Sequence, residues 1–447
     1  MKRLISCVLA LLYVMAGFAS GTWILHGKEY RVDTLYHAYI GPGTTQTSIK
    51  LAGPVNLRVF YTTTDLKNEN VDVRAIKHKD TLTGLGTVSN AAESHSTSNR
   101  SYFAGINADF FSSSMPCGIT VVDGEVYCSD QASGWSLFGI DANKIPYSGG
   151  GDFYVKLTAP DYSTAELSAM NLERGTNGLV LYSSRKGANT GTDGNGSEVV
   201  LIPDGEGNFL TPGATVRMRV QGNPNHAGSM PILDNGYILS GSGTKESFVS
   251  NLSEGDVVEV RCAIRFNGFT GGKIQQALGG CPMLVSGGKV LDTENALDHL
   301  TSAQPRTAVG YNAEKNKLVM LVADGRSSIS VGPISKVLAD IMIYAGCSEA
   351  MNFDGGGSST FYVKGEGVIN QPSDGSERSV TDGLYLSTDA PQNDVTITTI
   401  RFMDYAKTLN QGDAYTPVIY GYNQYGVLVD RLSLIHISEP TRLQLIS

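Results

Sequence analysis

Two Asn-x-Asp triplets, Asn107-Ala-Asp109 and Asn352-Phe-Asp354, are the residues whose types and spacing could do chemistry. Both lie on strand-like runs, and a spacing of two places the Asn and the Asp on the same face of a strand. A third carboxylate, Asp324, ends another apolar run. Cleavage of a glycosidic bond by acid–base chemistry requires paired carboxylates. The triplets alone are weak signals, because Asp residues at strand ends usually serve turns.

A glycine-rich segment follows the second triplet directly. Consecutive glycines cost backbone entropy, but they let main-chain N–H groups and nearby hydroxyls point into one concavity, which suits a phosphate oxyanion. No Gly-Lys-Ser/Thr sequence follows, so this is not a nucleotide-binding P-loop. Two arginines offer the fork geometry that recognises phosphate, although a single arginine is more often a solvated surface residue. The predicted anion-binding set is Gly355, Gly356, Gly357, Ser358, Ser359, Arg306 and Arg378.

The elements that must position these residues are a strand, a helix and a second strand. Lys317–Ala323 is a continuous apolar run, typical of a strand that is buried on both faces. Apolar residues then recur at helical spacing from Ile334 to Ala345, which predicts one buried face of an α-helix. Ala350–Asp354 is the next predicted strand. We therefore expect an α+β fold, a sheet-rich catalytic domain with a strand–helix–strand core.

Cys117 and Cys128 flank a predicted hairpin with its turn at Asp123-Gly124. Folding there brings the two cysteines nearly opposite each other, so we expect a disulfide in an exported protein. No C-x-x-C or H-x-x-x-H pair occurs, which argues against a structural zinc site. The pairing of the remaining cysteines stays open.

Composition and the chain ends limit the function classes. The chain has 447 residues and a net charge of −9, which argues against a dedicated nucleic-acid binder and predicts two or three domains. Residues 1–20 have a basic start and an apolar stretch, as a secretion signal does, so a secreted, cell-surface or periplasmic protein is expected. We expect no transmembrane segment in the mature chain. Residues 388–394 read as a linker, residues 395–431 as the start of an all-β immunoglobulin-like module, and residues 432–447 as a sequencing-adapter artefact.

Six segments, in order along the chain, resemble the phosphodiester glycosidase family. They are Gly105–Phe111, Gly279–Val285, Arg306–Gly310, Leu321–Arg326, Met351–Thr360 and Glu377–Leu384. The resemblance covers residues 103–387 as the family's domain, with residues 21–102 as a β-rich N-terminal part. It implies hydrolysis of an N-acetylglucosamine-1-phosphodiester-like substrate at the anomeric C–O bond. Carried over by position, Asn107, Arg306, Asp324, Asn352, Asp354, Gly355–Gly357 and Arg378 would line the family's cavity.

In the expected mechanism, the glycine segment and the arginines hold the phosphodiester. Asp354 or Asp324 activates water or stabilises the oxocarbenium-like centre. Asp109 is the third candidate catalytic carboxylate. The expected partner is a sugar-phosphodiester, and an envelope glycopolymer is a candidate source of it. No cofactor is expected. Two alternatives stay open: a metal-dependent phosphodiesterase with Asp109, Asp324 and Asp354 as ligands of a divalent cation, and a non-catalytic protein that binds envelope glycopolymers.

Overall fold

The computed structural model describes residues 21–130, 135–205, 209–266, 269, 271–292, 302–402 and 419–432. The expected secretion signal and residues 433–447 of the expected artefact lie outside this part of the chain. Within it, no helix has the length and apolar character needed to span a bilayer.

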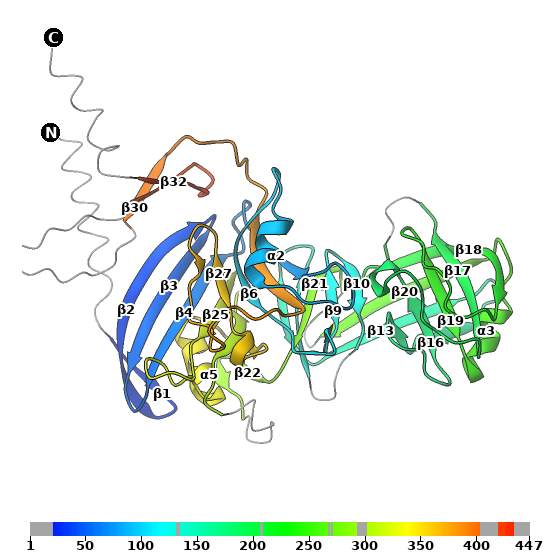
Figure 1. Ribbon diagram of the computed structural model, residues 1–447, viewed down its shortest axis with the longest axis horizontal. Coiled ribbons are helices and arrows are strands. Elements are labelled where there is room, and N and C mark those ends of the chain that lie inside the picture. The colour runs from blue at the N-terminus through cyan, green and yellow to red at the C-terminus, as the bar shows by residue number, and fades with distance from the viewer. Residues whose placement is uncertain are drawn as a thin grey trace, which may run out of the picture.

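The largest sheet has nine antiparallel strands and occupies one end of the molecule (Figure 1). Four N-terminal strands form one side of this sheet. The last of them, β4, pairs directly with β25, which lies some 250 residues later in the sequence. In spatial order the strands are β1 (Gly21–Leu25), β2 (Lys28–Gly41), β3 (Thr44–Ala52), β4 (Asn56–Asp65), β25 (Lys317–Ala323), β24 (Arg306–Tyr311), β26 (Glu349–Asn352), β22 (Met283–Ser286) and β23 (Lys289–Val290).

Strand β25 is central and buried on both faces, as its apolar sequence predicts. One face contributes Leu318, Met320 and Val322 to the core shared with a second sheet. The other face contributes Val319, Leu321 and Ala323 to the core shared with helix α5 (Ser335–Tyr344). The β25–α5–β26 unit confirms the predicted strand–helix–strand core, and the sheet-rich class is confirmed with it.

A second sheet packs on the first and carries helix α2 (Val88–His95) on its outer face. Its spatial order is β28 (Gly367–Val368), β27 (Phe361–Val363), β6 (Ser101–Asn107), β29 (Asp382–Thr388) and β5 (Asp72–Lys77). The body therefore has four layers: α5, the nine-stranded sheet, the five-stranded sheet and α2. Strand β6 crosses the middle of the second sheet and delivers the first triplet to its end.

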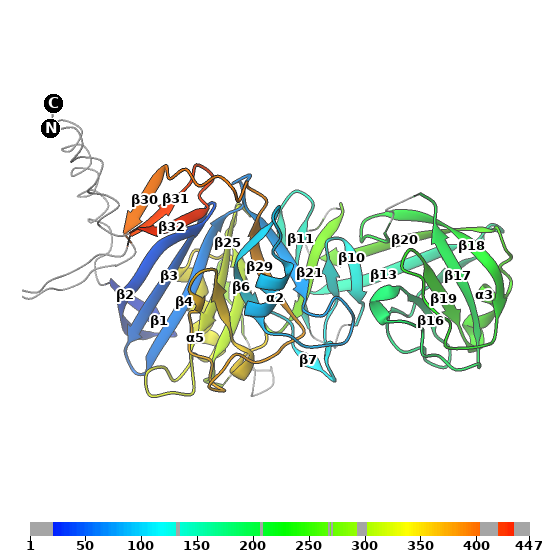
Figure 2. The ribbon, with the colours of Figure 1, turned by 45° about the horizontal axis from the view of Figure 1, so that its top comes forward.

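A third sheet connects this body to a separate lobe, which forms the far end of the molecule in Figures 1 and 2. The connecting sheet contains β10 (Glu125–Cys128), β9 (Thr120–Val122), β21 (Ile274–Gly280), β11 (Ser136–Asp141) and β12 (Pro146–Gly149). The lobe's sheet contains β14 (Thr164–Glu166), β13 (Gly151–Thr158), β20 (Val257–Phe266), β18 (Thr215–Asn225), β17 (Ser197–Pro203), β19 (Tyr237–Gly241), β16 (Leu179–Tyr182) and β15 (Ala169–Met170), with short helices η1 (Ser184–Lys186), η2 (Gly243–Lys245) and α3 (Glu246–Ser250). One apolar core runs through both sheets.

The predicted hairpin at Asp123-Gly124 is confirmed, because β9 and β10 pair and both turn residues have positive φ values, 50° and 84°. The predicted disulfide is wrong, since Cys117 and Cys128 are free thiols. The pairing register explains this result: Cys128 lies opposite Thr120, whereas the backbone N–H of Cys117 donates to Phe110 beside the small β7–β8 hairpin (Phe111–Ser112 and Met115–Pro116).

The C-terminal described residues form a three-stranded sheet of β30 (Thr399–Phe402), β31 (Ile419–Tyr422) and β32 (Leu428–Leu432). It lies against β2, where the Arg401 guanidinium stacks 3.7 Å from the ring centre of Tyr39. The immunoglobulin-like module stays a prediction, since residues 403–418 lie outside the described part. The domain boundaries expected from the sequence also stay predictions.

Candidate active site

The structure brings the two Asn-x-Asp triplets together. Strand β6 ends at Asn107 and strand β26 ends at Asn352, so each Asp follows the end of its strand. Asn107 Nδ2 donates to the backbone oxygen of Asp354 over 2.7 Å, and the N–H of Asp354 donates to Ala108 over 2.8 Å. The expected convergence of the two triplets at neighbouring strand ends is therefore confirmed, although each Asp lies beyond its strand and the expected shared strand face does not apply.

Asn107 is fully buried, and its side chain fastens three segments of the site. Besides its bond to Asp354, its Oδ1 accepts from Thr307 Oγ1 at 2.8 Å and from the N–H of Thr360 at 3.1 Å. Thr307 Oγ1 also lies 3.2 Å from Ser359 Oγ. All these polar groups are satisfied within the protein, so Asn107 holds the site in shape.

Asp354 has the carboxyl group best suited to chemistry near neutral pH. Burial raises the pKa of Asp354 to about 6, and this effect outweighs the opposing effects of Ser358, Arg378 and the N–H of Gly355. The residue nevertheless remains partly exposed, as do Gly355 and Gly356. A carboxyl with this pKa and access to solvent can exchange a proton with a reactant at physiological pH.

Arg306 is a buried cation without a carboxylate partner among the described residues. Its side chain is 2% exposed, and its Nη2 donates to the backbone oxygen of Ser302 at 2.5 Å. Its Nε has no hydrogen-bond partner within the described ranges. Burial and the nearby Arg326 lower the pKa of Arg306 to about 10, while Asp354 acts in the opposite direction. The group therefore remains protonated at neutral pH, and an unpaired buried cation favours binding of an anion.

The triple glycine lets guanidinium groups approach the backbone closely. Gly356 has φ of 61°, and a Cβ at this position would lie 3.0 Å from Arg326 Nη2. A Cβ on Gly357 would clash with Arg378 Nη2 and with the Asp374 carboxylate. Arg378 pairs with Asp374 at 2.6 Å. Larger residues at these glycines would push the guanidinium groups away from the segment.

The expected cradle of free backbone N–H groups is a wrong prediction for most of this segment. It forms a short 3₁₀ turn, η3 (Gly356–Ser358), in which the N–H groups of Ser358 and Ser359 donate to Gly355 and Gly356. The N–H of Gly356 donates to Pro305 at 2.9 Å. The tight turn uses these donors internally, so they are not available to an anion.

Asp324 reaches the glycine segment only through an intermediate residue. Its Oδ1 accepts from the N–H of Gln371 at 2.8 Å and from Asn370 Nδ2 at 3.4 Å. The same Asn370 amide donates to the backbone oxygen of Ser359 at 3.1 Å. Burial raises the pKa of Asp324, and these hydrogen bonds oppose the shift. Its contacts position the chain that follows Ser359.

Asp109 lies in a buried network on the inner side of the site. Its Oδ2 accepts from the N–H of Gly118 at 2.7 Å, and its own N–H donates to Asp382 Oδ1 at 2.9 Å. Burial and the nearby Asp382 carboxylate raise the pKa of Asp109 well above its usual range. A Cβ on Gly279 would lie 2.6 Å from Asp109 Oδ2, so the backbone closes over this carboxyl group. Asp109 is thus enclosed by protein, unlike Asp354.

Asn352 is also turned into the protein interior. Its Nδ2 donates to the backbone oxygens of Cys281 at 2.8 Å and Phe353 at 2.6 Å, and its Oδ1 has no partner. Its partners are thus unlike those of Asn107, although both occupy the same place in their triplets.

Sequence reasoning missed three groups that the structure places here. Arg326 lies beside Gly356, and Asp382 and Lys77 complete the network around Asp109. Arg326 and Asp382 belong to the quoted segments Leu321–Arg326 and Glu377–Leu384, so their place inside the family motifs was an available signal. No signal in the sequence pointed to Lys77, because a lysine at a strand end usually points to solvent.

The three aspartates of the metal-site alternative have separate surroundings. Across the described residues there is no cluster of three or more His, Cys, Asp and Glu side chains with metal-binding geometry. Asp354 faces the arginines, Asp324 faces Asn370, and Asp109 faces Asp382. The residues do not fit a site in which one divalent cation is shared by all three.

Comparisons with known proteins place this chain among several that share its fold. An exported-protein candidate of Burkholderia pseudomallei K96243 superimposes with a TM-score of 0.61 at 17% identity, covering 83% of this chain and 99% of that one. A hypothetical protein from Synechocystis gives 0.59 at 15% identity, covering 77% and 62%. At these identities the likeness shows the fold alone. The zebrafish N-acetylglucosamine-1-phosphodiester α-N-acetylglucosaminidase catalytic domain gives a TM-score of 0.40 at 13% identity, with 80% and 87% covered.

Sequence comparison gives two further matches. The SPβ prophage-derived protein YomE of Bacillus subtilis strain 168 is 40% identical over 88 residues, which span 20% of this chain and 13% of YomE. Residues 213–387 match the model of the phosphodiester glycosidase family. That range contains Arg306, Asp324, Asp354 and Arg378, whereas Asn107 and Asp109 precede it. The resemblance of this chain to the phosphodiester glycosidase family is therefore confirmed, with residues 213–387 as the matching region.

Proposed function

We propose that the protein hydrolyses a sugar-1-phosphodiester at the anomeric C–O bond and releases a free sugar and a phosphomonoester. The observation that carries this proposal is the electrostatic interaction of Asp354, whose pKa is about 6, with the buried Arg306, which forms no ion pair among the described residues. A reactive carboxyl near a buried cation suits a reaction that expels an anion. The family match over residues 213–387 supports the same chemistry.

The proposed roles follow from charge and position. Above pH 6 Asp354 is a carboxylate, and it removes a proton from the water that attacks the anomeric carbon. The bond from that carbon to the bridging oxygen breaks, and its electron pair stays on the phosphate. Arg306, with Arg378 and Arg326, stabilises the departing phosphate. A phosphate ester is already a good leaving group, so no strong general acid is required.

The proposed location and substrate source go with this chemistry. An exported protein would meet sugar-phosphodiester links in cell-envelope polymers, and a structural neighbour is described as an exported-protein candidate. We therefore propose that the protein acts outside the cytoplasm on such a link.

The decisive experiment incubates the protein with a panel of sugar-1-phosphodiesters in ¹⁸O-labelled water. We expect the label in the sugar, because the C–O bond is cut. Label in the phosphomonoester would instead indicate P–O cleavage by a phosphodiesterase, and no turnover across the panel would favour a binding protein.

A matched pair of variants tests the assignment of the carboxylate. We expect Asp354→Asn to lower kcat at least 10³-fold while its circular dichroism spectrum stays that of the parent. Asp161→Asn removes an exposed carboxylate from a turn in the lobe and should leave kcat unchanged. Near-normal turnover by Asp354→Asn would refute the proposed role.

A further inference from the structure

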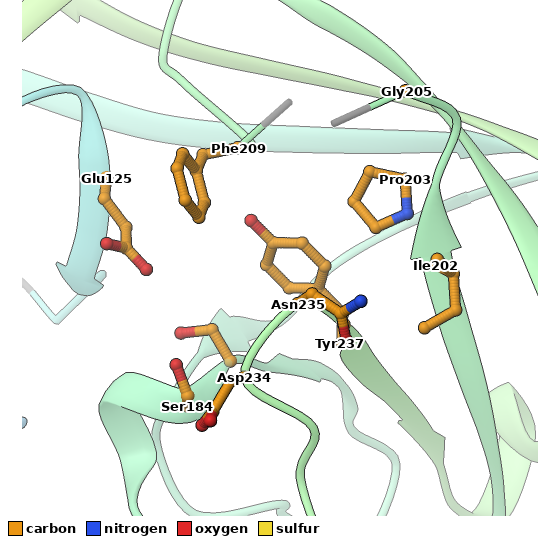
Figure 3. A pocket seen from close by; sticks show the side chains of 11 residues that line it. Glu125, Ser184, Ile202, Pro203, Gly205, Phe209, Asp234, Asn235 and Tyr237 are labelled. Carbon is orange, nitrogen blue, oxygen red and sulfur yellow. The ribbon is translucent and has the colours of Figure 1, made fainter. Parts of the chain in front are cut away.

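A second concavity lies far along the chain from the arginines, where the lobe meets the connecting sheet. It has a volume of about 520 Å³, within the range of small-molecule sites. Its walls come from β10, η1, the end of β17 and the turn before β19. Figure 3 shows Glu125, Phe209, Asp234 and Tyr237 around this space. We call it the lobe cleft.

The lobe cleft combines an aromatic face with hydrogen-bond acceptors. Phe209 is 51% exposed, which is unusual for a large aromatic ring, and Ile202 and Pro203 extend the apolar surface. The carboxylates of Glu125 and Asp234 can only accept hydrogen bonds when they are ionised. Sugar rings present apolar C–H faces and a rim of hydroxyl donors, so these two kinds of surface complement a carbohydrate.

Charge separates this cleft from the arginine site. Among its described lining residues there is no lysine or arginine, and Asp234 contributes an acidic group. Glu125 is also acidic, but it pairs with Arg185, so Asp234 is the group that would repel a phosphorylated or otherwise anionic polymer here. The lining therefore favours a neutral glycan and disfavours the phosphodiester itself.

An adjoining concavity of about 320 Å³ extends the surface available to a ligand. It shares Glu125 and Phe209 with the lobe cleft, and its floor includes the largely buried Tyr102 and Tyr127. Arg185 also lines it, but both Nε and Nη2 of this arginine donate to Glu125 Oε2, at 2.9 and 2.7 Å. This pairing compensates its charge, but Lys77 and His95 also line the adjoining concavity, so the case for a neutral glycan rests on the lobe cleft itself.

We infer that the lobe cleft is a carbohydrate-binding site that holds a neutral oligosaccharide against Phe209, with Asp234 accepting hydrogen bonds from its hydroxyl groups. This site is separate from the hydrolytic site proposed above, and binding does not depend on hydrolysis. It would let the protein hold a glycan chain while the arginine site acts on a phosphodiester.

The test measures binding by isothermal titration calorimetry on the Asp354→Asn protein, with linear hexamers of N-acetylglucosamine, glucose and mannose as probes. At least one hexamer should bind with a dissociation constant below about 1 mM. Phe209→Ala and Asp234→Ala should each weaken that binding tenfold or more. Phe209→Tyr should keep the affinity of the parent for that hexamer, because the aromatic ring is retained.

The matched control is Tyr162→Ala, which removes another exposed aromatic ring, 86% exposed, from the same lobe. It should leave binding unchanged. The inference is overturned if none of the three hexamers binds, if Phe209→Ala binds as the parent does, or if a glycerol-phosphate hexamer binds as tightly as the neutral ones. Hydrolysis of a small sugar-1-phosphodiester by Phe209→Ala in the wild-type background should stay normal, which distinguishes loss of this site from failure of the proposed activity.

Discussion

Asp354 would set the pH dependence of the proposed reaction. Burial disfavours its ionised form and raises its pKa to about 6, so the carboxylate needed as a base is lost as the pH falls below 6. We expect log(kcat/KM) to rise with unit slope below pH 6 and to level off above it. A rate profile between pH 4 and 8 checks this, and activity that falls as pH rises through 6 would assign an acid role to this residue.

A second prediction at the level of single residues concerns the role of Arg306 in anion binding. Arg306 is buried and forms no ion pair among the described residues, so replacing it with an apolar side chain should weaken anion binding without loss of stability. We expect Arg306→Met to weaken binding of inorganic phosphate at least 30-fold, as measured by calorimetry, and to keep or raise the melting temperature. Arg100→Met is the control, since Arg100 pairs with Asp389 instead. Unchanged phosphate binding by Arg306→Met would remove this residue from the site.

At the scale of elements, the glycine turn predicts how backbone shape controls the arginines. A methyl group at Gly357 would displace the exposed Arg378–Asp374 pair, which can move without disturbing the core. We expect Gly357→Ala to raise KM for a sugar-phosphodiester about tenfold and to lower the free energy of unfolding by less than about 1 kcal/mol. Gly150→Ala, at a position with open space, should change neither. A Gly357→Ala enzyme with parental KM would show that Arg378 does not touch substrate.

The buried network beneath the site joins strands β5 and β29 with the segment after β6. Lys77 and Asp382 are both buried and interact electrostatically, so removing either charge leaves the other uncompensated. We expect Asp382→Asn to lower the free energy of unfolding by about 3 kcal/mol. The double variant with Lys77→Met should cost less than the sum of the two single changes. Urea unfolding of the four proteins measures the coupling, and strict additivity would show that the two groups do not interact.

Local pattern predicted individual elements well, because local forces decide them. The apolar run of β25, the helical spacing of α5 and the Asp123-Gly124 turn all carry their structure within about ten residues. The free N–H cradle failed for a related reason: a triple glycine permits many conformations, and contact with Pro305 selects a tight turn. Arg306 and Asp354 were identified by residue type, but Lys77 becomes relevant only through burial.

At the scale of the whole molecule, the pairing of strands that are distant in the sequence could not be predicted. Nothing in β4 indicates that it will lie beside β25, and nothing in residues 150–266 indicates that they leave the body as a lobe. Such choices depend on the summed fit of distant apolar faces and not on any motif. The free thiols of Cys117 and Cys128 show the same limit, because strand register decides which residues face each other.

The shared core makes the lobe and the connecting sheet one cooperative unit. Leu239 of the lobe and Ile274 of β21 belong to the same buried cluster. We expect Leu239→Ala to cost about 2–5 kcal/mol and to lower hydrogen-exchange protection of β21 amides as well as lobe amides. Leu321→Ala, in the core beneath α5, is the control and should leave lobe protection unchanged. Loss of protection confined to the lobe would show two independent units.

The buried guanidinium of Arg306 has a practical consequence for anyone who handles this protein. A positive charge that is held inside the fold, with no ion-pair partner in the part of the chain that the structure describes, will attract small oxyanions from the solution. Phosphate-buffered saline or ammonium sulfate would then load the preparation before any substrate arrives, and slow turnover in such media would reflect competition. Purification in chloride salts with an organic amine buffer keeps this arginine free for the substrate.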